Sequence, residues 1–153
     1  MNLIGPDIYK LRVSRNRCSV TSPDGQPNFV APATSRKPKL YVVSRNLSLA
    51  YVGVTKQPLS NRLRGGMQAN GKHGYHGYAW RGSDSELRLD VWYLDGATAD
   101  RISLELETIE AEVVHLFRVR FGQWPSDQTE IHFHPSSDFH KLAAQQILDK
   151  LNQ

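Results

Sequence analysis

The stretch KLYVVSRNLSLAYVGVT, residues 39–55, decides the fold of this chain. It holds two apolar runs, residues 40–43 and 49–54, on either side of the polar triplet Ser44-Arg45-Asn46. Short apolar runs joined by a few polar residues predict paired strands, because alternate side chains of both runs can then face one core. We therefore expect a β-hairpin over these residues.

A helix is expected immediately after the hairpin. Pro58 suits its first turn, because the fixed φ of proline is already helical. The helix should run to about Met67, where Gly65 and Gly66 stop it. Residues 87–94 then alternate apolar and other side chains, which predicts a third strand.

The C-terminal half carries the strongest helical pattern. Apolar residues recur there at helical spacing from Ile102 to Leu116, and Gly122 is placed to end the helix. A short strand is expected over residues 130–134, followed by a helix from about Ser137. We expect an α+β fold: a small three-stranded, mostly antiparallel sheet flanked by helices.

The N-terminal segment has a different composition. Residues 1–38 hold five of the eight prolines, and residues 21–38 are typical of a loop. Only residues 7–13 have the apolar pattern of a short strand. We therefore predict an extended basic arm over residues 1–38 and a single domain over residues 39–153.

Charge divides the chain into two halves. Residues 1–82 carry 13 Lys and Arg against Asp7 and Asp24, whereas residues 83–153 carry 6 against 13 acidic residues. A basic half of this kind is an electropositive field suited to a polyanion, since each cation near a phosphate releases condensed counterions. Solubilising charge on a chain that folds back on itself is the alternative explanation.

Composition limits the compartment and excludes some classes of protein. No apolar run approaches the 18 or so residues that cross a bilayer, and the N-terminus lacks the pattern of a secretory leader. Cys18 is the single cysteine, so no internal disulfide and no zinc ribbon is expected. The sequence predicts a cytoplasmic protein that does not contact membranes.

Five short motifs follow one another in a defined order. They are Lys39-Leu40-Tyr41, Tyr51-Val52-Gly53, Arg62 on the next helix, Ile109-Glu110-Ala111-Glu112-Val113-Val114, and Pro125-Ser126-Asp127-Gln128. In this order the chain resembles the GIY-YIG nuclease superfamily, most closely its compact type II restriction endonucleases. The chain departs from the family pattern in its lost first glycine, one extra residue before Arg62, and Gln128 in place of asparagine.

The resemblance implies a GIY-YIG-like fold and a role for each motif residue. Tyr41 would be the general base, with Tyr51 in support. Arg62 would hold the scissile phosphate, because its planar fork suits phosphate oxygens. Glu110 would bind one Mg²⁺ or Mn²⁺, a hard cation that prefers carboxylate ligands. Gln128 would fix the phenol or phosphate geometry through its amide.

Several neighbouring residues compete for these roles or add to them. Either tyrosine alone is more often a plain aromatic of a β-sheet. Glu107 and Glu112 are rivals of Glu110, and Arg64 is the rival of Arg62. The remaining candidates are His76 or His73 as the group that orients water or relays a proton, and Arg64, Lys72, His73 and Lys56 as nucleic-acid contacts.

The sequence therefore predicts a metal-dependent DNA endonuclease with one active site per chain, working as a monomer or a homodimer. One alternative is a nucleic-acid-binding module on the same scaffold with little or no cleavage, which the Gln128 exchange permits. The other is a ribonuclease of a defence or toxin system, for which RNA replaces DNA as the partner.

Overall fold

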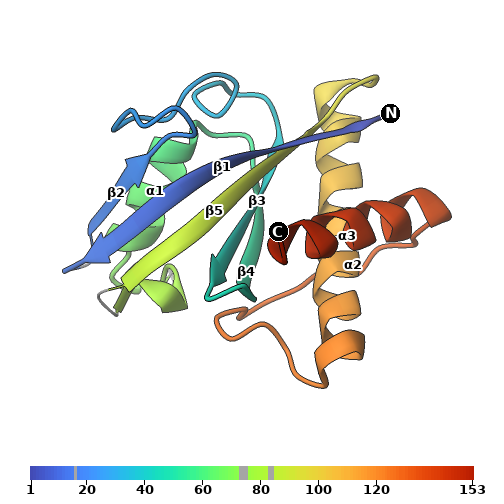
Figure 1. Ribbon diagram of the computed structural model, residues 1–153. Helices are drawn as coiled ribbons and strands as arrows, with labels where there is room; N and C mark the ends of the chain where they lie inside the picture. The colour runs from blue at the N-terminus through green and yellow to red at the C-terminus, as the bar shows by residue number, and fades with distance from the viewer. Residues whose placement is uncertain (16, 73–75, 83–84) are drawn as a thin grey trace.

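The computed structural model describes residues 1–153 except 16, 73–75 and 83–84. Its strands form one fully antiparallel sheet in the order β2-β1-β5-β3-β4 (Figure 1). The strands are β1 Leu3–Ser14, β2 Arg17–Thr21, β3 Lys39–Arg45, β4 Ser48–Thr55 and β5 Ser85–Leu94. The expected α+β class is confirmed, but the expected three-stranded sheet is wrong because the sheet has five strands.

The additional strands, β1 and β2, come from the segment expected to be an extended basic arm. The short strand expected over residues 7–13 is confirmed within β1, but residues 3–21 belong to the sheet and do not form an arm. In β1 the side chains of Tyr9, Leu11 and Val13 are buried, whereas Lys10 and Arg12 between them are exposed. This alternation lets one face of the strand join the core while its charges remain in water. β1 pairs with β5 along most of its length and with β2 on its other side.

The hairpin is confirmed as β3 and β4, and the helices lie close to their expected positions. Helix α2 ends at Gly122, which adopts the left-handed conformation that glycine allows. Helix α1 begins after Pro58 but continues through Gly65 and Gly66. The helices are α1 Leu59–Gln68, the short 3₁₀ turn η2 Ala79–Gly82, α2 Ala99–Phe121 and α3 Asp138–Leu151.

The helices cover opposite faces of the sheet (Figure 1). Helices α2 and α3 pack on one face, in a cluster that includes Trp92 and Leu106. Helix α1 and the turn η2 pack on the other face, in a cluster that includes Tyr41 and Trp80. β4 is the outer strand on one side of the sheet, so groups from both faces can meet at its edge.

Residues 130–134 form no strand, which corrects the expectation for this segment. Just before it, the chain runs along the free edge of β4, where Asp127 donates its backbone N–H to the carbonyl of Ala50 at 2.9 Å. No helix in the described part of the chain has the length and apolar character needed to cross a membrane.

Candidate active site

A small cavity of about 200 Å³ opens at the β4 edge of the sheet. Three of the predicted residues line it: Tyr51 from β4, Arg62 from α1 and Glu110 from α2. Because α1 and α2 lie on opposite faces of the sheet, only this edge can bring a side chain of each helix to a shared space. Residues 77–79 and 129–132 complete the wall.

The two predicted tyrosines lie on the same face of the hairpin. Val43 of β3 pairs with Tyr51 and Tyr41 pairs with Gly53, so the two phenols are diagonal neighbours with ring centres 6.0 Å apart. The ring of Tyr41 lies over Gly53, where a Cβ atom would overlap it. Gly53 is therefore required for the packing of Tyr41.

Burial separates the roles of these phenols. Tyr41 is 0% exposed and its hydroxyl hydrogen bonds to that of Tyr78, with the two oxygens 2.9 Å apart. Tyr51 is only partly buried and lines the cavity. Desolvation raises the pKa of Tyr41 and of Tyr51 far above the ordinary value, although the charge of Arg62 opposes the shift in both. Both phenols are neutral at neutral pH in the unliganded protein.

Tyr78 is a third tyrosine of the site. Its ring stacks on Trp80 and lies edge-on to Tyr51, with ring centres 4.5 and 5.3 Å apart. The guanidinium of Arg62 lies 5.1 Å from the centre of the same ring, which holds a cation over an aromatic face. Tyr78 thus positions both Tyr41 and Arg62.

Tyr78 belongs to none of the five motifs and lies in a stretch rich in glycine and aromatic residues, 72–82. It belongs to the buried core under α1, where its ring lies against Gly66 at a point that a Cβ atom would fill. Residues 129–132, including His132, were not expected at the site either, although they line the cavity. Their position follows from the path of the chain along the β4 edge, for which residue type gives no signal.

Glu110 and Glu130 are the two acidic residues that line the cavity, and Glu130 pairs with His132 at 3.1 Å. Glu110 is the one that the resemblance singles out. Burial raises its pKa to about 8, and the nearby Glu107 carboxylate adds to the shift. Within the described residues, no basic side chain forms an ion pair with it. A desolvated carboxylate without a cationic partner is expensive, and a divalent cation would relieve that cost. Its rival Glu107 pairs instead with His134, at 3.4 Å.

The donor set fits Mg²⁺ rather than a protein-enclosed metal. Among the described residues, no group of three or more His, Cys, Asp or Glu side chains is arranged to hold a metal ion. Mg²⁺ needs no such cage, since it keeps several waters and uses one or two carboxylates plus substrate phosphate. Glu110 is a carboxylate of the kind that Mg²⁺ uses.

Gln128 lies beside the cavity and contacts the backbone of β4. Its amide oxygen accepts the Val52 N–H at 2.9 Å, and its amide nitrogen donates to the Val52 carbonyl at 3.2 Å and the Glu130 carbonyl at 3.0 Å. The side chain therefore takes the place of a neighbouring strand at the residue next to Tyr51. The longer glutamine reaches this backbone and positions Tyr51 indirectly.

The remaining predicted residues do not line this cavity. His76 is exposed and lies against Gly71, and Lys72 is exposed. Lys56 pairs with Asp100 at 3.1 Å on the surface. Arg64 points to the other side of α1, into a separate cavity. His73 lies outside the described residues.

Comparisons with protein-family models, with curated proteins and with solved structures find no match to this chain.

Proposed function

We propose that this protein is a metal-dependent endonuclease that hydrolyses phosphodiester bonds of DNA, as in the GIY-YIG superfamily that its motifs resemble. One observation carries the proposal: Tyr51, Arg62 and Glu110, from three elements, line a single cavity at the β4 edge. These are a phenol, a permanent cation and a carboxylate, which are the groups needed to orient water, hold phosphate and bind Mg²⁺.

In this reaction a water oxygen forms a bond to phosphorus, and the bond between phosphorus and the leaving ester oxygen breaks. By the resemblance, the leaving group is the 3′ oxygen, so the products carry a 5′-phosphate and a 3′-hydroxyl. The proton of the attacking water must be accepted, and the leaving oxygen must gain one.

Each side chain has a defined task. Arg62 would contact the non-bridging oxygens with a guanidinium already oriented by the Tyr78 ring. Glu110 would hold Mg²⁺ or Mn²⁺, which supplies electrostatic stabilisation of the phosphate charge when bound. Tyr51 lines the cavity and would accept the proton of water as a phenolate, which forms only when a bound divalent cation and Arg62 offset the burial that raises its pKa, its own proton going to solvent. The resemblance gives this role to Tyr41, but Tyr41 is fully buried. Tyr41 then supports Tyr51.

The test is the cleavage of supercoiled plasmid by the pure protein with Mg²⁺, with Mn²⁺ and with EDTA. We expect nicked or linear plasmid with either metal and intact plasmid with EDTA. Glu110→Gln should reduce the rate by a factor of about 10² or more, because it removes the metal-binding charge without changing size. Glu112→Gln on the same helix is the matched control, and the protein is purified identically in each case.

Intact plasmid under every condition, together with retained DNA binding, would overturn the nuclease proposal in favour of a binding module. Labelled RNA and DNA offered side by side distinguish the deoxyribonuclease from a ribonuclease. We further propose that the protein works in the cytoplasm, which suits the free thiol of Cys18, and as a monomer or homodimer.

A further inference from the structure

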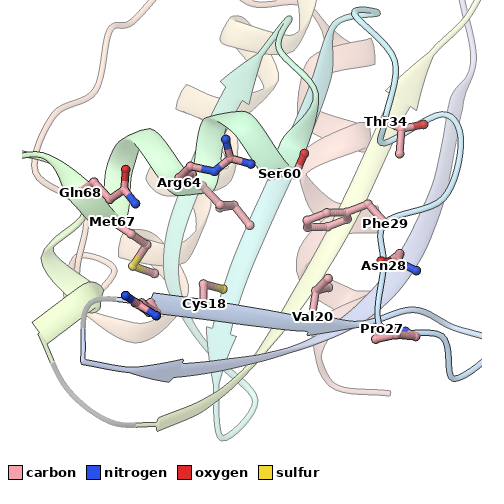
Figure 2. A pocket seen from close by; sticks show the side chains of 12 residues that line it. Cys18, Val20, Pro27, Asn28, Phe29, Thr34, Ser60, Arg64, Met67 and Gln68 are labelled. Carbon is pink, nitrogen blue, oxygen red and sulfur yellow. The ribbon is translucent and has the colours of Figure 1, made fainter.

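A second and larger cavity lies on the opposite side of α1 from the candidate active site. Its volume is about 560 Å³, within the range of small-molecule and nucleotide sites. Its walls are strand β2, the loop over residues 27–34 and the outer side of α1 (Figure 2). None of the residues assigned to cleavage lines it.

The lining of this cavity is positively charged. Arg17 at the start of β2 and Arg64 of α1 both line it, and both are exposed. Among the described residues no Asp or Glu lines the cavity. A space with two guanidinium groups and no acidic group selects an anion, and the planar fork of arginine favours phosphate.

The interior is apolar and includes an aromatic ring. Leu63 and Met67 of α1 are buried at its floor, and the ring of Phe29 points from the loop into the space between α1 and β2 (Figure 2). Amide groups of Asn28 and Gln68 line the same cavity and could bond to polar edges of a ligand. A ligand with an aromatic ring, polar groups at the ring edge and a phosphate would complement the Phe29 ring, the amides and the arginines.

The loop that carries Phe29 is held in place from both ends. The hydroxyl of Tyr9 in β1 accepts the N–H of Val30 at 3.3 Å. At the other end, Leu59 at the start of α1 donates its N–H to the carbonyl of Ala33 at 3.0 Å. The Phe29 ring itself packs on the Tyr9 ring, with centres 4.8 Å apart. The ring is therefore available for stacking at little cost in ordering.

Helix α1 relates this cavity to the candidate active site. Arg62 and Arg64 are two residues apart, so a helix of 3.6 residues per turn directs them to opposite sides. A helix with its side chains is about 10 Å across, which a nucleic-acid strand spans in about three nucleotides at 3.4 Å each. One strand can therefore cross α1 with a phosphate at Arg62 and a nearby nucleotide at the second cavity.

We propose that the cavity between β2, α1 and residues 27–34 binds one nucleotide, with its base against Phe29 and its phosphate between Arg17 and Arg64. The natural source is a nucleotide of the DNA strand being cut, a reading that rests on the proposed nuclease function. A free mononucleotide has the same chemistry and is the other source. An unpaired base fits this site, because a base inside a duplex does not offer its faces to Phe29.

The single cysteine provides a direct measurement of occupancy. Cys18 lines the cavity and is partly exposed, so a maleimide can reach it. Burial raises the pKa of its thiol to about 11, so the reaction is slow and is followed at mildly alkaline pH. The full-length protein is labelled in EDTA, alone and with oligothymidylate, the same oligonucleotide with abasic sites, a matched duplex, or thymidine monophosphate. At ligand concentrations roughly ten times Kd, occupancy predicts labelling that is about tenfold slower.

We expect oligothymidylate to protect Cys18 and the abasic oligonucleotide to protect it less. Protection by thymidine monophosphate alone would assign the site to a free nucleotide and would still support the proposal. An unchanged labelling rate with every probe would overturn it. Because labelling needs no cleavage, protection with uncut plasmid would refute only the nuclease function, whereas cut plasmid without protection would refute only the nucleotide site.

Substitutions supply the second readout, which is the anisotropy of a fluorescent oligothymidylate. Arg17→Ala and Arg64→Ala should each weaken its binding about tenfold, because each removes a charged contact to phosphate. Phe29→Leu keeps an apolar side chain for the core and should weaken binding about fivefold or more by removing base stacking. Arg36→Ala, an exposed cation near the same loop, is the control. Wild-type affinity in both Arg17→Ala and Arg64→Ala would contradict the proposal.

Discussion

At the scale of single residues, three tyrosines of the same site differ in their access to solvent. Tyr51 and Tyr78 both line the cavity, but the Tyr78 hydroxyl bonds to that of the fully buried Tyr41, whereas Tyr51 is partly exposed. A phenol that transfers a proton must contact the attacking water, so position in the cavity decides the catalytic role. Tyr41 and Tyr78 then serve to fix Tyr51 and Arg62.

This difference can be measured with two matched substitutions. Tyr51→Phe should lower the cleavage rate by a factor of about 10² to 10⁴ with little change in stability, since it removes only the hydroxyl at the cavity. Tyr41→Phe should cost about 1 kcal/mol of stability, because the Tyr78 hydroxyl loses a buried partner, and should slow cleavage much less. Single-turnover kinetics and urea unfolding give the two quantities. A larger rate loss in Tyr41→Phe would contradict the assignment.

Lys39 gives a pH-dependent prediction about stability. Its ammonium is buried and donates to the carbonyls of Ser35 and Gln57 at 2.9 and 3.0 Å, and desolvation lowers its pKa to about 8 from the usual 10.5. Between these two pH values the unfolded chain holds more protons than the folded chain, so the contribution of Lys39 to the free energy of unfolding rises with pH.

The measurement compares wild type with Lys39→Met by denaturant unfolding across that window. The difference in unfolding free energy between the two proteins should shift in favour of wild type as the pH rises from about 8 to 10.5, and should stay constant below about 8. Both proteins contain the same tyrosines, so the effect of tyrosine titration on the free energy of unfolding cancels in this difference. A difference that is flat across the window would show that Lys39 titrates normally in the folded protein.

The sequence was sufficient to choose several residues of the candidate site but not their geometry. Tyr51, Arg62 and Glu110 were chosen because their motifs resemble those of the GIY-YIG superfamily, and they line one cavity. The role of Gln128 could not be predicted, because its side chain bonds to the backbone of Val52. Every residue has the same backbone groups, so the sequence does not indicate which one Gln128 contacts. Tyr78 was missed for a similar reason, since its segment has no regular periodicity.

At the scale of elements, the β4 edge is completed by a side chain rather than by a strand. The Gln128 amide pairs with both polar backbone groups of Val52, and Asp127 bonds to Ala50 and to Arg45. This arrangement fixes the position of the cavity wall and satisfies an edge that would otherwise be open. The chain segment that follows α2 therefore covers the free edge of β4 beside the cavity.

Gln128→Ala tests this arrangement. It removes three hydrogen bonds in a partly buried position and should lower the free energy of unfolding by about 1–3 kcal/mol. The Val52 amide should also exchange its hydrogen faster, which NMR can follow for that residue. Gln145→Ala on the exposed face of α3 is the control. Unchanged exchange at Val52 would mean that the amide does not hold the edge.

Helices and the hairpin were predictable because their signals are local. The periodicity of α2 and the glycine that follows it are contained in one stretch of sequence. The short strand over residues 7–13 was predicted, but the full length of β1, its place in the sheet and β2 were missed. Pro6 interrupts the strand pattern, the segment is basic, and β1 pairs with β5, which lies far along the chain. Residues 130–134 have the alternation of a strand but no neighbouring strand to pair with, so alternation alone gave a wrong prediction.

At the scale of the whole molecule, the two charge halves of the sequence share one sheet. The basic half supplies β1 to β4 and α1, and the acidic half supplies β5, α2 and α3. Both cavities described above border α1 and contain arginine from the basic half. The uneven distribution of charge along the sequence therefore makes the side of the molecule with α1 electropositive, which suits a nucleic acid, and places the acidic half on the side with α2 and α3.

Deletion of residues 1–21 tests whether this segment is a structural part of the sheet or a dispensable arm. An arm could be deleted with little loss, but β1 buries Tyr9, Leu11 and Val13 and covers β5. Each of these side chains contributes about 1.5–3 kcal/mol when buried, which together is comparable to the total stability of a small domain. We expect the truncated protein to be unfolded by circular dichroism. Removal of residues 152–153 is the control, and a cooperative thermal transition in the truncated protein would contradict the expectation.

The position of β1 has a consequence for synthesis on the ribosome. β1 leaves the exit tunnel well before its partner β5, which ends at Leu94, so the strand must wait until residues 85–94 have been translated before it can pair. The hairpin of β3 and β4 with α1 involves only nearby residues and can form earlier. During that interval the buried face of β1 is available to chaperones, and the rate of translation through β5 determines how long the nascent chain stays in this vulnerable state.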